Sequence, residues 1–74
     1  MNDFFNKFTQ REREVLDLLV EGYSNPEIAE MLNITIHTVK AHISSMYEKA
    51  GVYSRVRLAV RACREQMANK IITK

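Results

Sequence analysis

Residues 24–45 hold two helix starts separated by a short turn, and this arrangement restricts the possible folds more than any other feature of the chain. Each start carries a small polar residue that can accept a hydrogen bond from the free backbone N–H groups of a first helical turn. Thr35 caps the second helix of this pair. The first helix of the pair can be capped by Ser24, in a capping box with Glu27, or by Asn25. The proline that follows Asn25 favours Asn25 as the cap.

Two more helices flank this pair. Thr9 and Glu12 form a capping box that opens a helix, and Gly22 fits a C-terminal cap just beyond its end. Gly51 ends the helix that Thr35 opens, and Ser54 then caps the last one. Only two glycines and one proline interrupt the chain, so the sequence predicts an all-α domain of four helices.

The apolar residues predict how these helices pack. We expect one domain over residues 1–74, with a core over 8–67 and tails over 1–7 and 68–74. The third helix carries a buried stripe at helical spacing, and the fourth carries an apolar side on which Val60 is partly core. The two sets are Val39, Ile43, Met46 and Ala50 on the third helix, and Val56, Ala59, Val60, Cys63 and Met67 on the fourth. Phe4, Phe5 and Phe8 are expected to pack on the domain or on a partner.

Composition excludes several classes of protein. Cys63 is the only cysteine, so neither an intrachain disulfide nor a cysteine zinc site can form. His37 and His42 are spaced so that they do not share a helix face, and we expect no metal and no cofactor. No apolar run is long enough for a membrane span, and a lone thiol without an export signal indicates the cytoplasm. No nucleophile with a base, carboxylate pair or phosphate loop is present, so the sequence predicts no enzyme activity.

Charge is unevenly distributed, although the net charge is only +2. Residues 1–34 hold three cations and seven anions, whereas residues 35–74 hold eight cations and two anions. A domain with this polarity can present its positive side to phosphate groups, or the charges can simply face solvent. The charge alone leaves both interpretations open.

The polar face of the third predicted helix, the one that Thr35 opens, favours the interpretation in which the positive side of the domain contacts phosphate groups. Its side chains are short or basic, with no acidic residue before Glu48. Small residues let a helix approach base edges, and the hydroxyls and free N–H groups at a helix start suit phosphate. Two helices joined by a short turn, the second with such a face, are typical of a DNA-binding helix-turn-helix. The candidate residues are Thr35, His37, Thr38, Lys40, Ala41, Ser44 and Ser45.

Residues 8–62 resemble the C-terminal DNA-binding domain of the LuxR/NarL (GerE-like) family of bacterial transcription regulators. The matching segments are Thr9–Leu16, Gly22–Ala29, Ile34–Thr35, Thr38–His42, Lys49–Val52, Ser54–Arg55 and Ala59–Val60. Region 4 of sigma factors is the nearest alternative among DNA-binding folds, but a fourth helix opened by Ser54-Arg55 fits the LuxR/NarL pattern better.

The resemblance implies that the third helix reads the major groove and that the fourth helix pairs two protomers on a pseudo-palindromic site. It places Lys40, Ala41 and Ser44 toward base edges. Backbone contacts would come from Thr38 and Lys49, with Ser24 and Asn25 approaching phosphate. The expected dimer interface is Val56, Ala59, Val60 and Cys63.

Two positions depart from the family pattern. Ala50 stands where leucine is usual, which leaves a smaller core contact at the end of the third helix. Ser44 stands where a long polar or basic residue is common, so specificity is expected to depend on Lys40, water and DNA shape.

The expected partners are double-stranded DNA, a second copy of the chain on DNA, and RNA polymerase. Most members of the family carry an N-terminal receiver or ligand-sensing domain, so the chain is either a standalone regulator, which Met1 and the residues after it slightly favour, or a response regulator effector domain. A protein-interaction module that holds a regulator or a polymerase subunit is the competing function.

Overall fold

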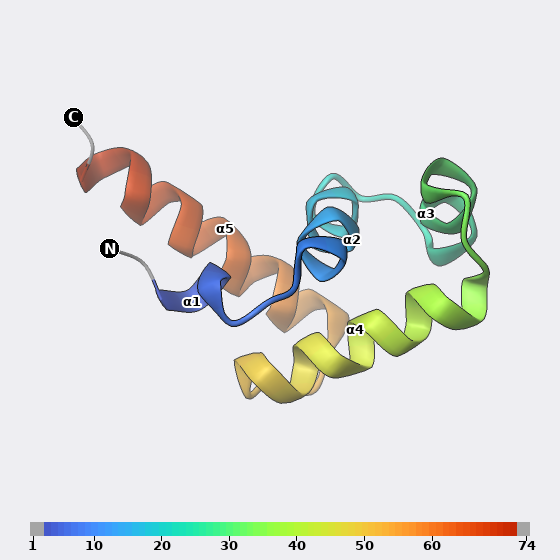
Figure 1. The fold of residues 1–74 in the computed structure, drawn as a ribbon. Helices are drawn as coiled ribbons and strands as arrows, with labels where there is room; N and C mark the ends of the chain where they lie inside the picture. The colour runs from blue at the N-terminus through green and yellow to red at the C-terminus, as the bar shows by residue number, and fades with distance from the viewer. Residues whose placement is uncertain (1–2, 73–74) are drawn as a thin grey trace.

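The computed structural model describes residues 3–72, which form five helices and no strand (Figure 1). The all-α class predicted from the sequence is confirmed, and the four predicted helices are present. A short helix before them was not predicted. The helices are α1 (Asp3–Asn6), α2 (Gln10–Val20), α3 (Asn25–Leu32), α4 (Ile36–Ala50) and α5 (Arg55–Ile72).

Local capping sets the start of α3. The Ser24 hydroxyl accepts a hydrogen bond from the Glu27 N–H at 3.3 Å, and the Glu27 carboxylate accepts one from the Ser24 N–H at 2.8 Å. The sequence-based preference for Asn25 as the N-cap is therefore wrong, because Asn25 is the first helical residue. A reciprocal capping box satisfies two backbone donors, and Pro26 is tolerated because a first-turn N–H has no intrahelical partner. The box predicted at Thr9 and Glu12 is confirmed.

Asn33 makes the turn between α3 and α4. Its φ of 58° is the only positive φ of a non-glycine residue in the described part of the chain, and asparagine tolerates this left-handed conformation. The following Ile34 N–H donates to the Ala29 carbonyl at 3.0 Å, which closes the helix end. Thr35 then caps α4 by accepting from the Thr38 N–H at 3.0 Å, as predicted. The turn thereby fixes the direction in which α4 leaves α3.

The core lies where α4 packs against α2, α3 and α5. Each fully buried aliphatic side chain contributes about 1.5–3 kcal/mol relative to an exposed one, so a small domain depends on a few such residues. The predicted stripe of α4 is buried as expected. The core consists of Phe4, Phe8, Val15, Leu16, Leu19, Ile28, Ala29, Val39, Ile43, Met46, Ala50, Leu58 and Ala62.

The segment before α2 is part of this core. Phe4 is only 4% exposed, and its ring packs edge-on against Phe8, with ring centroids 5.2 Å apart. The Arg61 guanidinium lies 5.0 Å from the centroid of the Phe4 ring, in cation–π contact. Of the two alternatives expected for the phenylalanines, Phe4 and Phe8 therefore follow the first, because both pack on the domain. At the other end, α5 is helical through Ile72, and residues 73–74 lie outside the described residues.

The rotation of α5 about its axis differs from the prediction. Leu58 and Ala62 are fully buried, whereas Val60 is 42% exposed and is not partly core as expected. The physical reason is that α5 has two apolar sides, and contacts with α2 and α4 decide which of them packs. The side that was predicted from periodicity faces outward. None of the helices described over residues 3–72 is both long and apolar enough to cross a membrane.

Candidate DNA-binding surface

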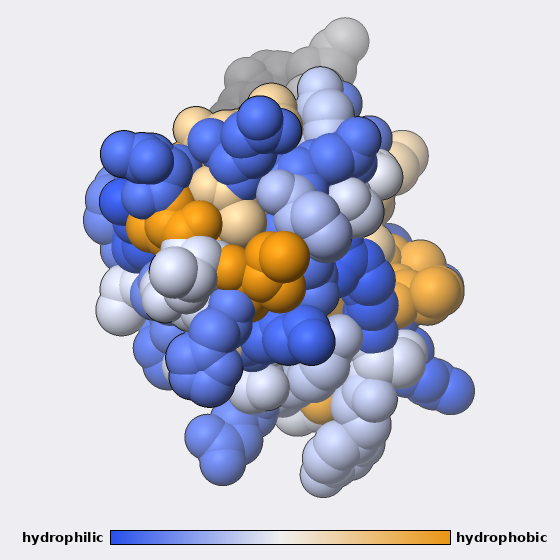
Figure 2. All heavy atoms as spheres, turned by 90° about the vertical axis from the view of Figure 1, so that its right-hand side faces the viewer, coloured by the Kyte–Doolittle hydropathy of each residue, from blue (hydrophilic) through white to orange (hydrophobic). Residues whose placement is uncertain are grey.

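The outer face of α4 brings most of the predicted binding residues together. This face lies opposite the stripe of Val39, Ile43 and Met46, so its side chains point away from the core. Thr38 is half-buried, and its hydroxyl lies 2.9 Å from the Thr35 hydroxyl. Figure 2 views the end of the molecule with α3 and the start of α4, where a mainly hydrophilic surface contains small hydrophobic patches. The exposed members of the face are Thr35, His37, Lys40, Ala41 and Ser44.

The start of α3 lies beside this face. Asn25 shares a surface hollow with Lys40 and Ser44 of α4 and with Arg55, the first residue of α5. Ser24 is exposed at the same helix start, where its side chain caps α3. Three helices therefore supply polar side chains to one continuous surface.

Ser45 and Lys49, two other predicted binding residues, lie toward α2 instead. The Ser45 hydroxyl donates to one Glu12 oxygen at 2.6 Å, and the Lys49 ammonium donates to the other at 2.8 Å. Because a hydroxyl has a single proton, Ser45 has none left to donate to DNA in this arrangement. Lys49 keeps two further protons and is partly exposed, so a DNA contact by Lys49 remains compatible with the structure.

Glu12 is the one charged residue that the described part of the chain buries, at 4% exposure. Burial raises the pKa of this carboxyl, but the hydrogen bonds from Lys49, Ser45 and the Thr9 N–H, with the charge of Lys49, outweigh burial and lower the pKa to about 2. The carboxylate therefore stays ionised at neutral pH and links the start of α2 to the second half of α4.

Arg55 was missed as a candidate functional residue. Its guanidinium donates to the Asn25 side-chain oxygen at 2.6 Å and to the Tyr23 carbonyl at 2.7 Å. The available signal was its position, because a cation in the first turn of a helix opposes the helix dipole and needs a compensating partner. The role of Glu12 between helices had no such signal, since its capping box already explained the glutamate.

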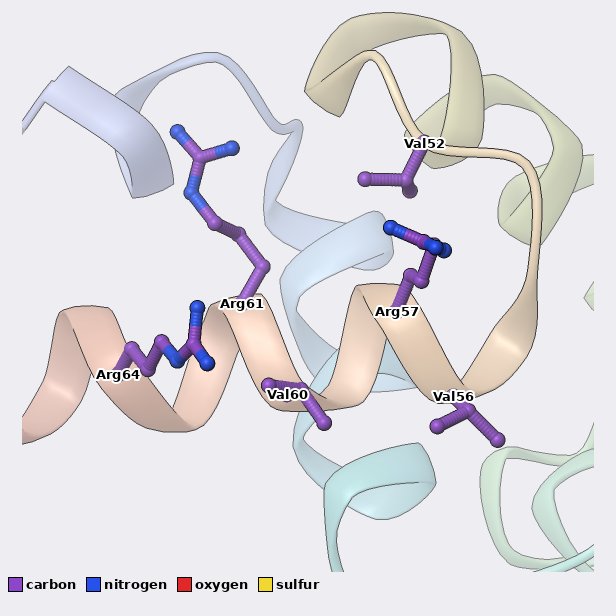
Figure 3. Close-up of a pocket in the computed structure, with 6 residues that line it drawn as sticks. All are labelled: Val52, Val56, Arg57, Val60, Arg61 and Arg64. Carbon is purple, nitrogen blue, oxygen red and sulfur yellow. The ribbon is translucent and has the colours of Figure 1, made fainter.

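The predicted dimer residues occupy the outer side of α5. Val56, Val60 and Cys63 are exposed, and Ala59 is half-buried against the core. Met67 continues this side one turn later and is also exposed. Figure 3 shows Val56 and Val60 with three arginines of α5 (Arg57, Arg61 and Arg64) around a shallow pocket. The side is apolar along its centre and basic at its edge.

Comparison with known proteins identifies the family. The profile described as bacterial regulatory proteins, luxR family, matches residues 6–62. The chain is 48% identical over 61 residues to the transcriptional regulatory protein LiaR of Bacillus subtilis (strain 168), an alignment covering 82% of this chain and 29% of LiaR. It is 42% identical over 60 residues to the response regulator protein VraR of Staphylococcus aureus (strain Mu3 / ATCC 700698), covering 81% of this chain and 29% of VraR.

The chain thus spans less than a third of the length of these relatives. The profile match covers more than half of the chain and includes α2, α3, α4 and the start of α5. On this basis the chain belongs to the luxR family of bacterial regulatory proteins.

Proposed function

We propose that this domain binds double-stranded DNA as the effector part of a transcription regulator, with α4 in the major groove. The exposed face of α4 carries the proposal, because it combines Lys40 and His37 with the small residues Ala41 and Ser44. Short side chains allow the helix backbone to approach base edges, and the Lys40 ammonium favours phosphate. The names of the relatives, a transcriptional regulatory protein and a response regulator protein, support the same role.

Lys40 is expected to be the main long donor on this face. Lys40→Ala should weaken binding to a site selected from random DNA by roughly 1–3 kcal/mol if the ammonium contacts a base. If Lys40 contacts only phosphate, binding to selected and mixed-sequence duplexes should fall together. Fluorescence anisotropy over a range of salt concentrations measures both, and Lys7→Ala, an exposed lysine outside α4, controls for the loss of one charge.

The same titration tests the function itself. Binding by the wild-type domain should weaken steeply as salt rises, because bound cations of the protein release counterions from DNA. A wild-type domain that binds no duplex at low salt would contradict the proposal and favour the protein-interaction module instead. An unchanged affinity of Lys40→Ala, with normal wild-type binding, would remove only Lys40 from the interface.

We also propose that two copies pair on a pseudo-palindromic site through the outer side of α5. Exposed Val56, Val60 and Met67 support this, because they form an apolar stripe at helical spacing that the monomer leaves uncovered. Cys63 lies within the stripe, and Ala59 lies at its edge. The proposal assigns the dimer interface to Val56, Ala59, Val60 and Cys63.

Val60→Asp should disturb pairing without unfolding the domain, because this side chain is already 42% exposed. We expect cooperative occupation of a selected two-half-site duplex to weaken by about tenfold or more, as for an interface residue worth over 1 kcal/mol. Analytical ultracentrifugation on the duplex reports the stoichiometry, and circular dichroism reports folding. Met31→Asp is the matched control, because Met31 is 51% exposed and lies on α3. Equal loss of cooperativity in both variants would contradict an α5 interface.

A further inference from the structure

Arg55 occupies a position that the energetics of its own helix does not favour. It is the first residue of α5, directly after the Ser54 cap, and the first turn of α5 contains no acidic residue. The partial positive charge of a helix N-terminus is unfavourable for an adjacent cation. Contacts outside α5 must therefore account for the placement of Arg55.

Those contacts join the start of α5 to the start of α3. One terminal nitrogen, Nη1, donates to Oδ1 of Asn25 at 2.6 Å, and the other, Nη2, donates to the Tyr23 carbonyl at 2.7 Å. Tyr23 and Asn25 lie on either side of Ser24, the N-cap of α3. The guanidinium plane is thus held at two points, and Arg55 cannot rotate freely as an exposed arginine does.

The held guanidinium lines a hollow that also faces α4. Asn25, Lys40, Ile43, Ser44, Tyr47 and Arg55 line it, and no acidic residue is among them. Two cations from different helices therefore line the same hollow as Ser44, a residue of the exposed α4 face. The backbone of α3 offers little to a ligand here, since Pro26 has no N–H and the Glu27 N–H is used by the cap. The side chains, and not the helix end, define the site.

We propose that Arg55 and Lys40 together bind one backbone phosphate of DNA in this hollow, with Asn25 positioning Arg55. A guanidinium has five N–H donors, and the two internal bonds leave three for phosphate oxygens. Because phosphate contacts fix how a protein sits on the duplex, this site sets the register of α4 in the groove. The inference rests on the DNA binding proposed above. It changes the expected role of Asn25 from a phosphate contact to a residue that orients Arg55, and it assigns Lys40 to a phosphate instead of a base edge.

Salt titrations on a mixed-sequence duplex test the site. For Arg55→Gln, the slope of log K against log salt concentration should decrease in magnitude by up to about 0.9, the value for one phosphate contact, because Lys40 still neutralises part of the charge of the shared phosphate. Arg13→Gln is the matched control, because Arg13 is an exposed arginine on α2, outside the hollow and outside the proposed dimer side. Its slope is expected to equal that of the wild type. Thermal unfolding of each variant identifies the temperature range in which all of them are folded.

Asn25→Ala provides a second variant that keeps every charge. It should retain the wild-type slope but bind about threefold to tenfold more weakly, because the guanidinium loses one of its two anchors. If Arg55→Gln does not fold, the site is tested with Asn25→Ala and with Arg55→Lys, which conserves the charge. Arg55→Lys is expected to keep the slope and lose affinity, because an ammonium cannot hold both internal contacts and the phosphate in one plane.

The outcomes separate this inference from the proposed function. Failure of the wild type to bind duplex at low salt overturns DNA binding itself. Normal wild-type binding with unchanged slope and affinity in Arg55→Gln overturns the phosphate site alone. An equal fall of the slope in Arg55→Gln and Arg13→Gln also overturns it, because that result indicates a general charge effect. Wild-type affinity in both Asn25→Ala and Arg55→Lys overturns the positioning role of Asn25.

Discussion

Replacing Glu12 by glutamine (Glu12→Gln) is expected to lower the free energy of unfolding by about 3 kcal/mol at neutral pH, the value that corresponds to a pKa lowered from 4.5 to about 2. Both Glu12 oxygens accept bonds from α4, through Ser45 and Lys49, and the carboxyl is almost fully buried. A neutral amide keeps the shape of the side chain but loses the charge-assisted bonds. Urea denaturation followed by circular dichroism measures the difference.

The pH dependence gives the sharper test of this prediction. The folded-state pKa of Glu12 lies below the unfolded value, so its stabilising contribution is fully present above about pH 4.5 and disappears as pH falls toward 2. The wild type and Glu12→Gln should therefore converge in stability across that range. Glu14→Gln is the control on the same helix, because its partner Arg11 is exposed, and it should change stability by only about 0.5 kcal/mol. A difference between wild type and Glu12→Gln that stays constant with pH would show that the carboxylate charge is not the cause.

Helix boundaries could be predicted because short-range chemistry determines them. Thr9, Thr35 and Ser54 cap helices at the expected positions, and Gly51 ends α4 with a φ of 71° that glycine adopts without steric cost. Each signal involves residues within one turn of one another, so the sequence displays it directly. Ser24 was the exception, since two local rules competed there and the reciprocal capping box prevailed.

Contacts between helices could not be predicted from residues that are close in the sequence. The four residues of α1 are too few for any periodicity, so the sequence left open whether Phe4 packs on the domain or on a partner, and the folded chain shows that the domain buries it. Arg55 and Asn25 lie thirty residues apart, and Glu12 lies still further from Lys49. Nothing local indicates such pairs. The exposed α4 face was predictable because a single helix defines it, whereas the roles of Arg55 and Glu12 depend on how several helices meet.

The fourth predicted helix, α5, shows most clearly why packing between helices could not be predicted from the sequence. Val56, Val60 and Met67 recur at helical spacing, but so do Leu58 and Ala62, and the structure buries the second set. Periodicity gives the spacing of each apolar side and does not say which side faces the core. Because Leu58 and Ala62 face the core, Val56, Val60 and Met67 stay exposed. The proposed dimer side and the core therefore use different residues of α5.

Leu58→Ala is therefore expected to be far more damaging than Val60→Ala. Leu58 is fully buried, so its truncation should lower the free energy of unfolding by about 2–5 kcal/mol, a large part of the stability of a domain this small. Val60→Ala should cost about 0.5 kcal/mol or less, because exposed substitutions rarely exceed that value. Each kcal/mol corresponds to a melting-temperature shift of roughly 4–8 °C for a domain of this size, so thermal denaturation resolves the two variants. The measurement is made at several protein concentrations, because dimer formation would add stability that depends on concentration. A larger cost for Val60→Ala than for Leu58→Ala in the dilute limit would mean that α5 packs with its other apolar side inward, and the proposed dimer surface would then be part of the core.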